Sequence, residues 1–216
     1  MNLFVFLQEN YSTALLLTWE HLWMVGLSLL IAICTGVPIG ILITKNKNLA
    51  QKIIGSANVI MTIPSIALFG LMLPVLAVFG HGLGKVPAII ALVLYSELPI
   101  IRNTFIAIKN VDPAMVDAGK GMGMTKWQLL REVEIPLAVP VIIAGLRTAA
   151  VMIIGIAAIA AYVGAGGLGV FIQQGIARSH ESMVLAGALC VSLLAVIVDL
   201  GMGFLERWLT PRGIRL

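Results

Sequence analysis

DAGKGMGMTKWQLLREVEIP, residues 117–136, is a polar segment in a chain that is otherwise mostly apolar. Nine of the 24 charged residues fall between Arg102 and Glu134, and six of them lie inside this segment. Because a chain with so few charges elsewhere concentrates them here, we expect the segment to contact a partner outside the lipid. Its location and shape therefore decide how the rest of the sequence is interpreted.

The composition predicts a polytopic, all-α membrane protein. The 216 residues are 60% hydrophobic and 11% charged, whereas a water-soluble domain of this size needs a more polar exterior. We expect one membrane domain and no separate soluble domain. No cluster of basic residues carries interleaved aromatics, so nucleic acid is not an expected partner. The spacing of His, Cys, Asp and Glu predicts no metal site, and we identify no catalytic residue.

Five apolar stretches are long enough to cross a bilayer, at about residues 22–43, 53–79, 86–108, 137–163 and 183–204. Eleven of the 14 Lys and Arg residues fall in segments on one side of these spans, and only Lys85 and Arg178 fall on the other. Since excess positive charge marks the cytoplasmic face, the N-terminus is predicted outside and the C-terminus inside. This divides the chain into an external, amphipathic segment 1–21, a membrane domain 22–209 and a cytoplasmic tail 210–216.

The polar segment is predicted to form a helix–turn–helix knob in the cytoplasm. A first helix is expected from about Pro113, with Asp112 as its N-cap. Gly123 then allows a sharp turn, and a second helix over 125–133 begins with Thr125 as N-cap and ends at Pro136. Such a knob fits a groove on a soluble partner. An amphipathic hairpin on the membrane surface without a partner is the alternative.

The spacing within the knob resembles the coupling loop of ABC importer permeases, which reads Glu-Ala-Ala…Gly…Ile-x-Leu-Pro. Here Asp replaces Glu, Gly replaces the second Ala, Val replaces Ile and Ile replaces Leu. The glycine is the least conservative change, because it weakens a helix by roughly 1 kcal/mol relative to Ala. The resemblance implies a coupling loop within 108–136 whose ATPase-coupling residues are Asp117, Ala118, Gly119, Gly123, Val133, Ile135 and Pro136.

Four further stretches are similar to the permeases that import glycine betaine, carnitine and choline. They are TIPSIALFGLMLP (62–74), ELPIIRNT (97–104), GAGGLG (164–169) and DLGMGFLERWLTPRG (199–213). Methionine-type permeases share much of this layout and remain an alternative. The resemblance implies the type I ABC importer (MetI-like) fold, with about five transmembrane helices, in the bacterial cytoplasmic membrane.

The resemblance also implies the partners. They are a dimer of ATP-binding subunits, a second permease subunit (identical or similar), an extracytoplasmic substrate-binding protein and the lipid bilayer. The sequence contains no G-x-x-x-x-G-K-[ST] motif, so ATP hydrolysis is expected on another chain. We therefore expect no enzymatic activity and no cofactor in this chain. A self-sufficient channel or an ion-driven carrier is the alternative from another functional class.

Ionisable residues and prolines inside the spans are candidates for the translocation pathway. Glu97, Arg147 and Asp199 are costly in lipid and are expected to face the protein interior. We predict that Arg147 reaches Asp199 or Glu97, in a pair that either holds the spans together or forms an inner gate. Pro64, followed by Ser65, and Pro74 are expected to break the second span beside the pathway, and a kinked helix with a purely structural role is the alternative. The glycines of 164–169 allow tight packing or a re-entrant turn, and a plain connecting loop is the alternative.

Overall fold

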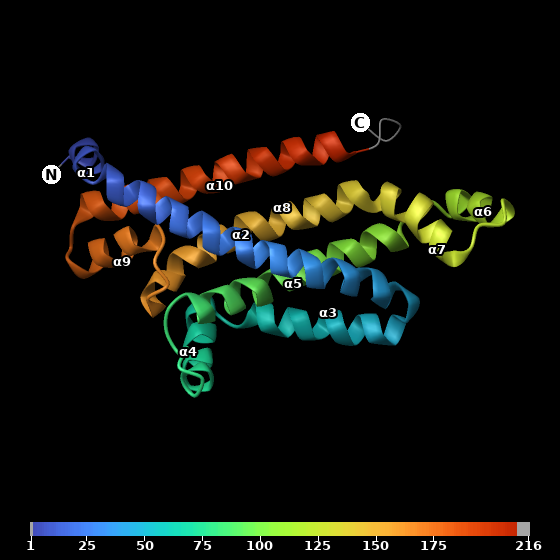
Figure 1. Ribbon diagram of the computed structural model, residues 1–216, viewed down its shortest axis with the longest axis horizontal. Helices are drawn as coiled ribbons and strands as arrows, with labels where there is room; N and C mark the ends of the chain where they lie inside the picture. The colour runs from blue at the N-terminus through green and yellow to red at the C-terminus, as the bar shows by residue number, and fades with distance from the viewer. Residues whose placement is uncertain (1, 211–216) are drawn as a thin grey trace.

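The described part of the chain is helical throughout. A computed structural model describes residues 2–210 and has no strand within them (Figure 1). The long helices are α2 (Tyr11–Leu42), α3 (Lys47–Thr62), α4 (Ser65–Ala77), α5 (Lys85–Lys109), α8 (Ile135–Ile159) and α10 (Glu181–Leu209). The short ones are α1 (Leu3–Glu9), α6 (Pro113–Gly121), α7 (Lys126–Leu129) and α9 (Gly169–Ala177). The predicted cytoplasmic tail, with Arg212 and Arg215, lies outside the described residues except for Thr210.

The helices account for about five membrane spans, as the sequence predicted. Four helical segments of residues 2–210 are long and apolar enough to cross a bilayer, and α3 with α4 makes a fifth if this bent pair counts as one span. The first span is longer than expected, because α2 already begins at Tyr11. Residues of the 1–21 segment therefore form α1 and the first turns of α2.

Pro64 breaks the second span, and α3 and α4 meet there at an angle of 100°. Ile63 and Pro64 are extended, with ψ of 126° and 136°. For Ile63 the reason is that a residue that precedes proline is disfavoured in the helical region. The hydroxyl of Tyr95 on α5 donates to the carbonyl of Ile63, which gives a partner to a backbone group at the break. Pro74, by contrast, lies inside α4 without ending it.

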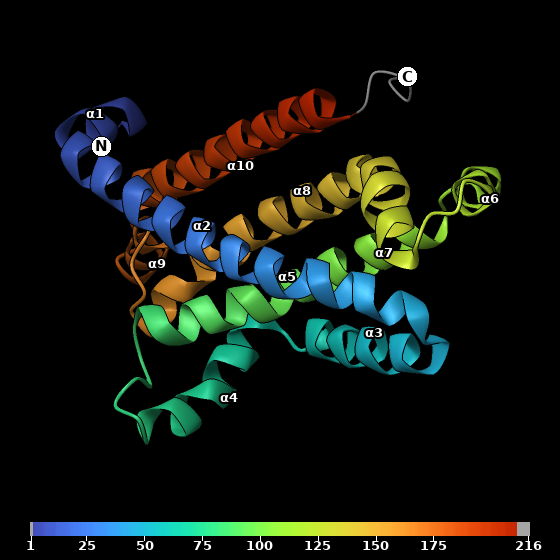
Figure 2. The ribbon, with the colours of Figure 1, turned by 45° about the vertical axis from the view of Figure 1, so that its right-hand side comes forward.

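Helix α5 lies at the centre of the bundle, between α2 and α8 (Figures 1 and 2). Gly36 and Gly40 form a G-x-x-x-G pattern on α2, and a Cβ at Gly40 would lie only 2.6 Å from Cβ of Thr104 on α5. On a second face of α5, a Cβ at Gly145 of α8 would lie 2.5 Å from Cβ of Asn103. Small residues therefore allow close contact on two faces of α5, as is common between membrane helices.

The glycine-rich turn at residues 164–169 packs against the N-terminal half of α2. The Gly167 N–H donates to Glu20 Oε2 at 3.1 Å, and Glu20 Oε1 also contacts Lys85 Nζ at 3.4 Å. The neighbouring His21 is fully buried, and its Nε2 lies 3.1 Å from the Ile154 carbonyl. Gly166 and Gly167 have φ of 83° and 75°, a conformation that L side chains rarely adopt. The turn is therefore a tightly packed connection between α8 and α9.

The two ends of the molecule carry different short helices. Figure 1 shows α1 and α9 at one end and α6 and α7 at the other, with the end of α10 also lying toward α6 and α7. In Figure 2, α6 still projects beyond the ends of the long helices. The predicted knob is therefore a projection at one end of the bundle.

Candidate functional site

The first helix of the knob begins as the sequence predicts. Asp112 is the N-cap of α6, and its Oδ1 accepts a hydrogen bond from the Ala114 N–H at 2.9 Å. Pro113 occupies the first helical position, where its missing N–H costs nothing. Asp117 is exposed and pairs with Lys120 at 2.9 Å, a contact between two solvated groups that contributes little stability.

The turn between the two knob helices depends on Gly123. This residue follows the C-cap Met122 of α6 with φ of 79°, so it takes the left-handed position at which glycine commonly ends helices. Thr125 then caps α7 through a capping box with Gln128. Both halves of the predicted helix–turn–helix are therefore confirmed at the level of their capping residues.

Gly119 is explained by packing rather than by helix propensity. It is buried, and a Cβ in its place would lie 2.6 Å from Leu129 Cδ1 and 3.2 Å from Met124 Sδ. The same Cβ would be 3.7 Å from Val133 Cγ2. The absence of a side chain at Gly119 therefore lets α6 lie close against the second helix of the knob.

The second knob helix does not end at Pro136, and this part of the prediction is wrong. Residues Lys126–Val163 form one helical segment, in which Leu130–Glu134 form a π-helical turn just before Pro136. Proline has no N–H to donate to the carbonyl four residues before it, and a π turn re-spaces the backbone hydrogen bonds at such a point. The knob is therefore continuous with the membrane helix α8.

A groove of about 560 Å³ lies at the base of the knob, between its helices and the ends of α2 and α5. Its wall includes Lys45 and Lys109 from those ends and Asp117 and Trp127 from the knob. Trp127 is 66% exposed, which leaves a large apolar surface open beside charged residues. Such a surface is typical of a protein contact.

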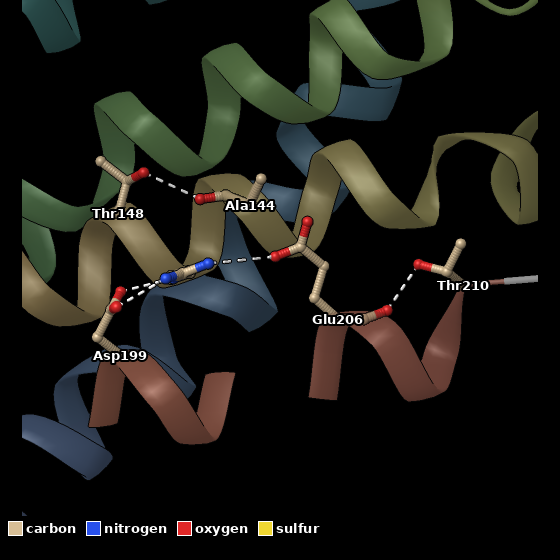
Figure 3. A network of polar contacts seen from close by, with 6 residues as sticks. Ala144, Thr148, Asp199, Glu206 and Thr210 are labelled. Atoms are coloured by element: carbon tan, nitrogen blue, oxygen red, sulfur yellow. Dashed lines mark hydrogen bonds and ion pairs between the residues drawn. The ribbon is translucent and has the colours of Figure 1, made fainter. Parts of the chain in front are cut away.

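A second cluster of functional candidates lies between α8 and α10. Arg147 makes a two-point contact with Asp199, with Nε–Oδ1 at 2.5 Å and Nη2–Oδ2 at 2.6 Å. Its Nη1 lies 3.7 Å from Oε2 of Glu206. Figure 3 shows Asp199 and Glu206 reaching from α10 toward α8. Gly203, between them on α10, leaves room for the guanidinium group, since a Cβ there would lie 3.3 Å from Nη1.

Glu97 is not part of this cluster. Its Oε1 accepts a hydrogen bond from the Thr35 hydroxyl of α2 at 2.6 Å. Its Oε2 is buried beside Gly36 and has no hydrogen-bond partner among the described residues. Of the two partners considered for Arg147, the structure therefore brings Asp199 to it and not Glu97. Pro64 and Ser65 lie at the α3–α4 break.

Comparison with known proteins identifies the family. Residues 36–211 match the family described as the binding-protein-dependent transport system inner membrane component. The chain belongs to this family. It is thus a multi-pass permease subunit of the cytoplasmic membrane, in a class of importers whose ATPase is a separate subunit.

Two curated relatives match the permease over nearly its whole length. The osmoprotectant import permease protein OsmW of Salmonella typhimurium is 50% identical over 97% of this chain and 98% of its own. The carnitine transport permease protein OpuCB of Listeria monocytogenes is 44% identical over 97% and 94%. Among solved structures, the MetNI methionine ABC transporter in inward-facing conformations has a TM-score of 0.80 at 25% identity, covering 89% of the permease and 94% of that chain. The predicted type I importer fold is therefore confirmed.

Sequence reasoning missed three features of these sites. Glu206 contacts Arg147 and was not singled out, although its spacing from Asp199, two helical turns along α10, could have suggested it. Thr35 contacts Glu97 from another helix and has no local signal. Gly119 was interpreted as a weak point of its helix, whereas it is a contact point.

Proposed function

We propose that this permease imports quaternary-ammonium osmoprotectants such as glycine betaine, carnitine or choline. The observation that carries the proposal is the 50% identity to an osmoprotectant import permease over essentially the full length of both chains. One relative from Bacillus subtilis, named for glycine betaine, carnitine and choline transport, is 42% identical over 97% of this chain. The likeness to the methionine transporter rests on a lower identity of 25%.

The knob is proposed to be the contact with an ATP-binding subunit. Three features support this role: α6 and α7 project from the bundle (Figure 2), Trp127 is exposed, and the knob continues directly into α8 through the π turn. A displacement of the knob therefore acts on a membrane helix without an intervening flexible loop. The charge asymmetry of the loops supports a cytoplasmic knob, with the N-terminus outside and the C-terminus inside.

The coupling residues fall into three groups by their place in the knob. Gly119, Gly123 and Val133 shape it, because they form its turn and its internal contact. Asp117 and Ala118 are exposed on α6 and are the surface that an ATPase groove would touch. Ile135 and Pro136 form the junction with α8. In this proposal, closure of two ATPase subunits on ATP moves two knobs, one from each permease subunit.

The pathway role of the intramembrane residues is also a proposal. Arg147 and Asp199 have side chains that are 37% and 36% exposed in this subunit. Charged groups are costly against lipid, so this face of α8 and α10 is expected to face water or a second permease subunit. Glu97, with Thr35, and the α3–α4 break at Pro64 and Ser65 are the other candidates for lining the route. An external binding protein would deliver the solute to it.

Uptake by cells tests the proposed solute class. The permease is expressed with its ATPase and binding protein in a strain that lacks other osmolyte transporters, and uptake of labelled glycine betaine is measured at raised osmolarity. Excess unlabelled carnitine or choline is expected to compete, and excess methionine is not. Uptake of labelled methionine in the same cells, with no uptake of glycine betaine, carnitine or choline, would overturn the proposal.

A further inference from the structure

The face between α8 and α10 holds a groove that the ion pair only partly fills. One cavity of about 430 Å³ is lined by Arg147, Leu200, Gly203, Phe204, Glu206 and Arg207. A second, of about 680 Å³, shares Arg147 and Glu206 with the first and extends past Asp199 and Thr148. Because the two cavities share Arg147 and Glu206 in their walls, we describe them as one groove with these charged residues at its centre.

Two charged side chains in this groove, Arg147 and Glu206, have hydrogen-bonding groups that could contact a further molecule. A guanidinium group has five N–H donors, and Asp199 accepts from only two of them. Glu206 Oε2 lies 3.7 Å from Nη1, which is an ion-pair distance but longer than a hydrogen bond. The side chain of Glu206 is 30% exposed. An N–H group of Arg147 and a carboxylate of Glu206 are therefore both open to a third group.

The groove combines contacts for two kinds of charge. The free N–H groups of Arg147 suit a carboxylate, which arginine binds with directional hydrogen bonds. Glu206 and the exposed ring of Phe204 line the same cavity and suit a quaternary ammonium group. Such a group has no N–H to donate, so it is bound by negative charge and aromatic faces. The set fits a zwitterion that carries both groups a short distance apart.

The positions of Asp199 and Glu206 along α10 give the depth of the groove in the membrane. Asp199 and Glu206 lie ten and three residues before Leu209, the end of α10. At 1.5 Å per residue, they are roughly 15 Å and 5 Å from that end. If the C-terminus is cytoplasmic, the groove lies in the inner half of the membrane, where a solute leaves the transporter.

The geometry points to an inner subsite for a zwitterionic quaternary-ammonium solute in this groove. Arg147 contacts the carboxylate, and Glu206 and Phe204 contact the ammonium group, while Asp199 fixes the guanidinium. Gly203 is the position that keeps the groove open beside Nη1. This inference rests on the proposed solute class and adds a binding site within the permease itself.

Protection from alkylation tests the subsite directly. The complete transporter, with Cys34 and Cys190 replaced by Ser, carries Leu200→Cys in the groove and is purified in detergent without the binding protein. Glycine betaine at ten times its dissociation constant is expected to slow the reaction with N-ethylmaleimide about tenfold, by mass action. Leu193→Cys is the matched control, because Leu193 and Leu200 lie on the same helix and are 62% and 66% exposed. Its reaction is expected to be unchanged.

Further variants assign the contacts. Adding Glu206→Gln or Phe204→Leu to Leu200→Cys is expected to weaken protection by both glycine betaine and choline. Gly203→Ala, which crowds Nη1, is expected to weaken protection by glycine betaine more than by choline, because choline has no carboxylate. A general loss of structure would instead change the alkylation rate of Leu193→Cys as well, and that rate is measured in every variant.

Three outcomes would overturn the subsite. The first is no protection of Leu200→Cys by glycine betaine, and the second is equal protection of Leu193→Cys. The third is protection by glycerophosphoethanolamine but not by glycine betaine, which would make the groove a lipid headgroup site. Glycine betaine uptake by the wild-type transporter is measured in parallel. Uptake without protection of Leu200→Cys contradicts the subsite alone, whereas no uptake contradicts the proposed function.

Discussion

Replacing Gly123 with alanine is expected to impair coupling between the ATPase and the permease, whereas the same change at Gly121 is not. Gly123 has φ of 79°, and Gly121 is the last residue of α6 with no positive φ. A Cβ would meet nothing within 4 Å at either position. The two variants therefore add the same methyl group to open space and differ only in backbone conformation.

The size of the effect of Gly123→Ala follows from this difference in backbone conformation. An L residue in the left-handed conformation costs about 1–2 kcal/mol, which lowers the population of the native turn relative to competing conformations by a factor of roughly 5–30. The competing conformations move Thr125 and its capping box, because these follow the turn directly. Alanine at Gly121 removes backbone freedom at a helical position and is neutral or stabilising, by up to about 1 kcal/mol.

The assay is transport-coupled ATP hydrolysis in proteoliposomes that contain the complete transporter, with binding protein and solute supplied. Gly123→Ala is expected to reduce solute-stimulated hydrolysis and uptake severalfold, and to reduce the ATPase retained on the permease during purification. Gly121→Ala is expected to match the wild type in all three measurements. If Gly123→Ala also matches the wild type, the shape of the turn does not matter for coupling and the reasoning is refuted.

Three further predictions concern the membrane helices. The single charge reversals Arg147→Asp and Asp199→Arg are expected to abolish uptake, since each places two like charges against each other inside a membrane span. The double reversal is expected to restore part of the uptake, and no recovery would show that the pairing is not what matters. Tyr95→Phe removes the hydroxyl that donates to the Ile63 carbonyl at the α3–α4 break, and it is expected to destabilise the permease by about 1–3 kcal/mol. The melting temperature in detergent is expected to fall, and an unchanged melting temperature would contradict this role of Tyr95. Gly40→Val is expected to lower the melting temperature relative to the wild type, because overpacking of this helix contact costs about 1–3 kcal/mol. Gly26→Val, where nothing lies within 4 Å of the added Cβ, is expected to leave it unchanged, and equal effects of the two variants would contradict a close contact at Gly40.

The features that the sequence predicted correctly are local. The spans follow from runs of apolar residues, and the knob follows from Asp112 and Thr125, whose side chains cap the helices that start directly after them. Gly123 ends α6 because its own backbone takes a conformation that other residues avoid. Each of these signals lies within a few residues of its effect, so a single sequence contains it.

The features that the sequence did not predict depend on contacts between distant segments. Gly119 is a weak helix residue by propensity, and only the position of Leu129 shows that the gap is needed. Whether Arg147 meets Glu97 or Asp199 depends on how α5, α8 and α10 rotate about their axes, which composition does not reveal. Pro136 ends an isolated helix by its local chemistry, yet the π turn before it lets the helix continue.

Uptake of labelled glycine betaine by proteoliposomes containing the permease, its ATPase and the binding protein tests the central claim most directly. If an ATPase drives the permease through the knob, accumulation requires ATP on the side of the membrane where the ATPase binds the knob, and it is lost with a non-hydrolysable ATP analogue. Accumulation driven by an ion gradient without ATP, or by the permease without the ATPase, would contradict it.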